Sequence, residues 1–80
     1  MDPGVAFGQV LRGLRREAGL SQEQLAFSAE IERNFVSLIE RGVNQPSIRV
    51  IFKLAHALGI SASQMLLLVE NKMLDGLRSD

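Results

Sequence analysis

The sequence predicts an all-α fold: a compact orthogonal bundle of five short helices in one domain, residues 1–80. Apolar residues recur at steps of three or four, as on one face of a helix, and no stretch alternates as a strand would. Gly19, Gly42 and Gly59 each follow such a stretch, and a serine precedes each next one. With 46% hydrophobic residues, the chain can bury a modest core.

The first two helices are predicted over about residues 5–18 and from about Gln22 onward. The first carries an apolar face ending near Ala18. The second begins near Gln22 because Ser21 and Gln24 have the spacing of a capping box, in which each side chain satisfies a backbone amide of the other.

Three further helices follow. The third is predicted over about residues 33–41, and Pro46 prevents it from continuing. Ser47 is expected to cap the fourth helix. Ser61 and Gln64 repeat the capping box, so the fifth helix begins there and is expected to run toward residue 74.

The composition argues against several classes of function. There is no cysteine, and His56 is the single histidine, so neither a metal site nor a thiol nucleophile is expected. No paired carboxylates, nucleophile with a base, or phosphate-binding glycine loop is recognisable, so we expect no enzyme activity, cofactor or small-molecule ligand. The longest apolar run, residues 65–69, is too short to span a bilayer, which predicts a cytoplasmic protein without a membrane partner.

The net charge of zero and the pI near 6.6 are unusual for a nucleic-acid binder. Most basic residues nevertheless precede the last helix, so one face of the bundle can still be positive.

Residues 21–42 hold two short helices separated by about three residues, which is the arrangement of a helix-turn-helix corner. Val36 and Ile39 would fill the inside of this corner. The opposite face of the second helix of the corner then presents side chains that can donate to and accept from base edges, among them Arg33, Asn34 and Ser37.

Here the chain resembles the phage-repressor and Cro-like helix-turn-helix family, also called the XRE family, over about residues 7–69. The matching segments are Leu20–Glu23, Leu25–Ala26, Ile39–Gly42, Pro46–Ile48 and Lys53–Ile60. An aromatic residue at Phe27 and the run Glu32–Ser37 look most like controller proteins of restriction-modification systems. The resemblance implies a lambda-repressor-like fold and binding to double-stranded DNA.

The resemblance also implies roles for single residues. Arg33, Asn34 and Ser37 match base-contacting positions, because residues near the start of a recognition helix reach base edges. The implied phosphate contacts are Gln22, Asn44, Gln45 and Ser47. Arg15 and Glu40 are implied to form a structural pair. The residues leave two interpretations open for Arg41 and Arg49, phosphate contact or solvated surface.

Two residues depart from the family pattern. Glu30 stands where the turn usually has glycine, and Glu32 replaces the usual cap residue before the recognition helix. Phe27 and Phe35 are expected to be partly buried.

The fifth helix is the predicted dimerisation element, together with the tail (residues 61–80). Its five consecutive apolar residues cannot all face inward, so Met65, Leu67 and Leu68 are assigned to a homodimer interface. The alternative is that Met73, Leu74 and Leu77 of the tail cover this face.

We therefore predict a transcriptional regulator that binds a palindromic operator as a homodimer. The alternative is an antitoxin or another protein-interaction module with the same fold.

Overall fold

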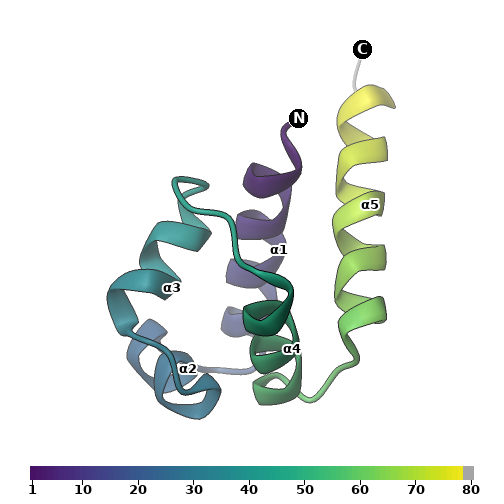
Figure 1. Cartoon of the computed structure of the whole chain (residues 1–80). Coiled ribbons are helices and arrows are strands. Elements are labelled where there is room, and N and C mark those ends of the chain that lie inside the picture. The colour runs from purple at the N-terminus through teal and green to yellow at the C-terminus, as the bar shows by residue number, and fades with distance from the viewer. Residues whose placement is uncertain (79–80) are drawn as a thin grey trace.

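The computed structural model describes residues 1–78, and these form five helices and no strand (Figure 1). The helices are α1 (Pro3–Glu17), α2 (Gln22–Ala29), α3 (Arg33–Glu40), α4 (Ile48–Ala57) and α5 (Ala62–Arg78). The predicted all-α bundle is therefore confirmed. Residues 79 and 80 of the predicted tail lie outside the described residues.

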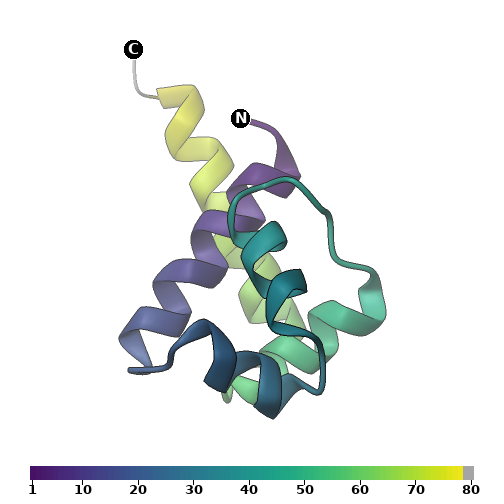
Figure 2. The same ribbon diagram turned by 90° about the vertical axis from the view of Figure 1, so that its left-hand side faces the viewer.

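The longest helices, α1 and α5, run side by side in opposite directions (Figures 1 and 2). On its other side α1 packs against α3, and α2 packs against both α3 and α4. The helix-turn-helix corner is thus held between α1 and α4, while α5 lies across α1 from the recognition helix α3.

Side-chain caps start four of the five helices: the predicted serines cap α2, α4 and α5, and Asp2, which was not predicted as a cap, starts α1. The Ser21 hydroxyl accepts the Gln24 amide at 3.0 Å and the Gln24 side chain accepts the Ser21 amide at 2.8 Å, which completes the predicted capping box. Ser47 and Ser61 cap α4 and α5. Helix α1 begins two residues earlier than predicted, because Oδ2 of Asp2 accepts the first free amides of the helix.

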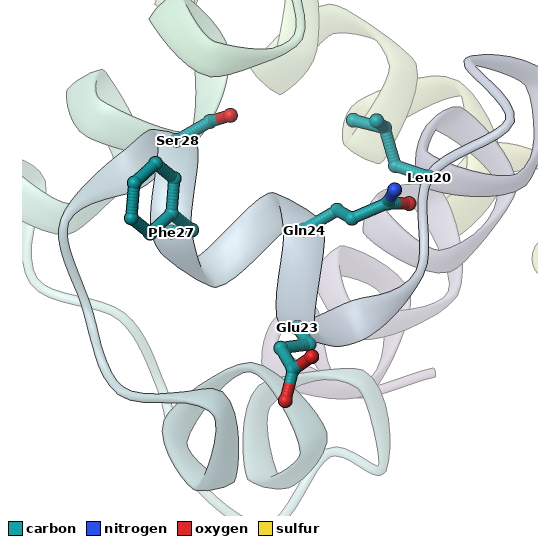
Figure 3. A pocket seen from close by; sticks show the side chains of 5 residues that line it. All are labelled: Leu20, Glu23, Gln24, Phe27 and Ser28. Carbon is teal, nitrogen blue, oxygen red and sulfur yellow. The ribbon is translucent and has the colours of Figure 1, made fainter.

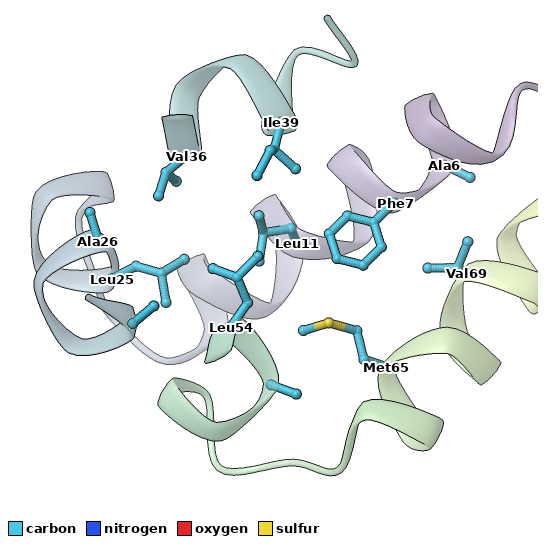
Figure 4. Close-up of a cluster of buried hydrophobic side chains, with 12 residues drawn as sticks. Ala6, Phe7, Leu11, Leu25, Ala26, Val36, Ile39, Leu54, Met65 and Val69 are labelled. Atoms are coloured by element: carbon cyan, nitrogen blue, oxygen red, sulfur yellow. The ribbon is translucent and has the colours of Figure 1, made fainter. Parts of the chain in front are cut away.

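One core fills the space between the five helices, and Figure 4 shows its side chains converging from all of them. Its largest fully buried members are Leu11, Leu25, Val36, Ile39, Leu54 and Met65. The prediction that Met65 belongs to the dimer interface is wrong. Its side chain has no exposed surface and points into the core, where apolar burial is favourable, so it is not available to a partner.

The outer face of α5 remains apolar and uncovered. Leu67 and Leu68 are 54% and 37% exposed, and Leu66 beside them is exposed as well. The alternative prediction, that the tail covers this face, is wrong, although Met73 of the tail packs against the core. Helix α5 continues to Arg78 and leaves Leu74 and Leu77 exposed.

Within the described residues, no single helix is both long and apolar enough to cross a membrane, and α4 and α5 meet that test only as a pair bent by 102°.

Candidate nucleic-acid interface

The turn between α2 and α3 is three residues long and depends on a left-handed residue. Glu30 has φ 58° and ψ 45°, and its amide donates to the carbonyl of Phe27. The next amide, of Ile31, donates to the carbonyl of Ala26 at 3.0 Å. This conformation suits glycine and is costly for a residue with a Cβ atom, so Glu30 departs from the family pattern in residue type and still adopts the left-handed conformation.

Glu32 takes the extended conformation of a helix cap, with φ −76° and ψ 145°, but its side chain accepts no backbone amide of α3. The first amides of the recognition helix therefore lack the side-chain acceptor that the serines supply to α2, α4 and α5.

The three predicted base-contacting residues share one face of α3. Val36 and Ile39 are buried against the rest of the bundle, while Arg33 and Asn34 are exposed and Ser37 is half-buried. In residues 1–78, no side-chain hydrogen bond or ion pair engages any of these three side chains. Their donors and acceptors are free to meet a ligand at the N-terminal half of α3.

Arg15 and Glu40 form an ion pair between α1 and α3. Nε of Arg15 donates to Oε2 of Glu40 at 2.7 Å, and a guanidinium nitrogen donates to Oε1 at 3.1 Å. Nη1 of Arg15 also donates to the carbonyl of Leu20 at 2.9 Å. The hydrogen bond to Glu40 raises the pKa of Arg15, with a smaller opposing effect of burial.

Gln22 also binds this pair, through a hydrogen bond that was not predicted from the sequence. Nε2 of Gln22 donates to Oε1 of Glu40 at 3.1 Å, and the two residues lie 18 positions apart, so no local spacing announces the bond. An amide nitrogen has two protons. A phosphate contact by Gln22 can therefore use the second side-chain N–H or the backbone amide at the start of α2.

The loop after α3 brings together most of the other predicted phosphate residues. Arg41, Gln45, Ser47 and Arg49 are exposed, and Asn44 is half-buried. The hydroxyl of Ser47 accepts the amide of Val50 at 3.2 Å as a helix cap, and this bond leaves its O–H proton free to donate. The loop is tied to α3 by the amides of Val43 and Asn44, which both donate to the carbonyl of Leu38.

The predicted burial of the Phe27 side chain is wrong. It was expected to be partly buried, but 86% of its surface is exposed, because the inner face of α2 is already filled by Leu25, Ala26 and Ala29. Figure 3 shows its ring at the rim of a shallow hollow, whose other lining residues are Leu20, Glu23, Gln24 and Ser28. Phe35 is partly buried, as predicted.

No three His, Cys, Asp or Glu side chains of residues 1–78 gather as ligands for a metal ion.

The helix-turn-helix family model matches residues 11–65, which includes the whole α2–turn–α3 corner. The chain belongs to the helix-turn-helix family. This family consists of DNA-binding transcriptional regulators rather than enzymes, so the chain is a DNA-binding regulator and not an enzyme.

Two relatives and one solved structure similar to this helix-turn-helix protein are named as control or controller proteins. Control protein C.BamHI of Bacillus amyloliquefaciens is 39% identical over 75% of each chain. Control protein C.MunI of a Mycoplasma species is 35% identical over 80% of this chain and 88% of its own. The crystal structure of the restriction-modification controller protein C.AhdI from Aeromonas hydrophila is 47% identical, covers 78% of this chain and 94% of its own, and superposes with a TM-score of 0.76.

Proposed function

We propose that this regulator acts in the cytoplasm as a homodimer on a palindromic operator, and that it is a controller protein of a restriction-modification system. The observation that carries the proposal is the face of α3 on which Arg33, Asn34 and Ser37 lie with free polar groups. An arginine suits a guanine edge and an asparagine suits an adenine edge, while Ser37 can donate or accept.

The phosphate contacts are assigned to residues on both sides of α3. Gln22 begins α2, and Arg41, Asn44, Gln45, Ser47 and Arg49 follow α3 in the chain. Backbone amides and uncharged side chains supply many of these contacts, so a net charge of zero is compatible with DNA binding.

Dimerisation is assigned to the exposed side of α5 that carries Leu67 and Leu68, without Met65. A two-fold axis at this face would relate the α3 helices of the two protomers to each other. Such a symmetric pair of recognition helices reads an inverted repeat. The role in a restriction-modification system rests on the relatives, two of which are control proteins and one a controller protein of such a system.

The test is selection from random DNA duplexes at physiological salt, followed by sequencing. We expect the wild type to enrich an inverted repeat, and Arg33→Ala to relax the preference at one position of each half-site, at a cost of about 1–3 kcal/mol. Lys72→Ala is the matched control, because Lys72 is an exposed cation on α5, across α1 from the recognition helix. It should return the wild-type sequence.

The second candidate function is binding to another protein, as in an antitoxin. The exposed aromatic side chain of Phe27, which lies on α2 and away from α5, favours it. Enrichment of no DNA sequence by the folded wild type would support this second candidate and contradict the first.

A further inference from the structure

The backbone of α1 touches the backbone of α3 at Gly8. A Cβ atom built on Gly8 would lie 2.3 Å from the carbonyl oxygen of Ile39 and 2.8 Å from that of Glu40. Both oxygens belong to the main chain at the end of α3, so neither can move aside unless α3 moves. Only a residue without a side chain fits at this position.

A second glycine of α1 gives the contrast. Gly13 lies in the same helix, and a Cβ atom built on it would meet nothing within 4 Å. Glycine inside a helix lowers stability relative to alanine. At Gly8 the close contact with α3 requires a glycine in spite of this loss of stability. At Gly13 no contact requires one.

Arg15 ties the same end of α3 to α1 through its ion pair with Glu40. Gly8 and Arg15 are seven residues apart, which places them on the same face of α1, two turns from each other. One end of the recognition helix is therefore fixed to α1 at two points. The other end carries Arg33 and Asn34.

We propose that Gly8 is a positioning residue for DNA recognition: its contact with α3, together with the Arg15–Glu40 pair, sets the tilt of the recognition helix. The inference rests on the proposed base contacts of α3. A methyl group at Gly8 would push the end of α3 away by about 1 Å, because close packing leaves no free space to absorb it. Ile39 and Arg33 are roughly 9 Å apart along the helix axis, so a tilt at one end displaces the other.

Such a displacement weakens base contacts more than phosphate contacts. A bidentate contact to a base edge requires a fixed geometry, whereas nonspecific affinity depends mainly on charge. Substitution of Gly8 should therefore lower the ratio of operator affinity to nonspecific affinity. A role confined to stability would lower the melting temperature and leave this ratio unchanged in folded protein.

The experiment compares the wild type, Gly8→Ala and Gly13→Ala on the operator selected by the wild type and on a scrambled duplex. Both dissociation constants are measured at one salt concentration and at a temperature at which circular dichroism shows each variant to be folded. We expect the affinity ratio to fall at least about tenfold in Gly8→Ala, as for one lost base contact, and to stay at the wild-type value in Gly13→Ala.

A folded Gly8→Ala with the wild-type ratio, or an equal fall in both variants, would overturn the inference. If Gly8→Ala does not fold, Arg15→Lys decides, because it removes the bidentate tie without adding an atom at Gly8. A fall in its ratio supports the inference and an unchanged ratio overturns it. If the wild type itself selects no operator, the proposed function fails, and the role of Gly8 falls with it.

Discussion

Arg15 and Glu40 meet across 25 residues of sequence through two hydrogen bonds, at 2.7 and 3.1 Å. The carboxylate of Glu40 is almost completely buried, and its Oε1 also accepts the side chain of Gln22. One carboxylate therefore joins α1, α2 and α3 at the base of the helix-turn-helix corner.

Glu40→Gln should destabilise the protein by about 3 kcal/mol, since removal of one partner leaves the largely buried guanidinium of Arg15 without its counter-charge. Urea denaturation measures the loss as a lower midpoint. Glu70→Gln makes the same change on the exposed side of α5 and should alter stability by less than about 0.5 kcal/mol. Equal effects of the two variants would show that the pair contributes nothing.

The stabilisation by Arg15 should not vary with pH around neutrality. The hydrogen bond to Glu40 raises the pKa of Arg15 in the folded state above its ordinary, strongly alkaline value, so its contribution is fully present below the unfolded-state pKa and is lost only as the pH rises through the folded-state pKa. The difference in unfolding free energy between the wild type and Arg15→Met should stay constant from neutral to mildly alkaline buffer. A difference that shrinks in this range would assign the effect to another group.

The helix boundaries were predictable because their signals are local. Ser21 with Gln24, and Ser61 with Gln64, lie within one turn of the helix starts that they cap. The burial of Met65 was not predictable, because residues 65–69 are all apolar and such a run has no polar face to orient the helix. The neighbouring helices decide that Met65 faces inward.

Glu30→Gly should stabilise the protein by about 0.5–1 kcal/mol. The left-handed conformation at φ 58° is costly for a residue with a Cβ atom and free for glycine, although glycine gives back part of the gain through the entropy of the unfolded chain. Thermal denaturation should show a higher melting temperature.

Two controls isolate the backbone effect at Glu30. Glu23→Gly changes the same residue type in the first turn of α2, where glycine has a poor helix propensity and the favourable acidic side chain is lost, so its melting temperature should fall. Glu30→Gln removes the charge and keeps the Cβ atom. If Glu30→Gln is as stabilising as Glu30→Gly, the charge and not the conformation is the cause.

Glu32→Asp should strengthen the start of the recognition helix by about 0.5–1 kcal/mol. The backbone already has the extended conformation of a cap, and the shorter carboxylate can reach the amide that Glu32 leaves without a side-chain acceptor. The charge does not change, so a gain in melting temperature reports capping alone. Ser47→Ala is the reverse experiment at α4 and should cost about 1 kcal/mol. A gain in the first without a loss in the second would argue against capping as the cause.

The predicted base-contacting face was accessible to sequence reasoning because Val36 and Ile39 define the buried side of a short helix, and Arg33, Asn34 and Ser37 lie away from it. The contact at Gly8 was not, since its partner Ile39 is distant in the chain. In the local sequence, Gly8 is distinguished only as a glycine inside a regular helix. Gly13 is another such glycine of α1, and it makes no contact of this kind.

Leu67→Asp should weaken the proposed homodimer at least about tenfold, because a charge at the centre of an apolar interface must be desolvated without a partner. Leu67 is 54% exposed and does not belong to the core, so the monomer should remain folded. Sedimentation equilibrium across a concentration series gives the dissociation constant. Phe27→Asp is the control, with the same change at an exposed apolar residue of α2. If Phe27→Asp dissociates the dimer and Leu67→Asp does not, the interface lies on α2. A two-fold axis at α5 would then no longer account for an inverted repeat in the operator.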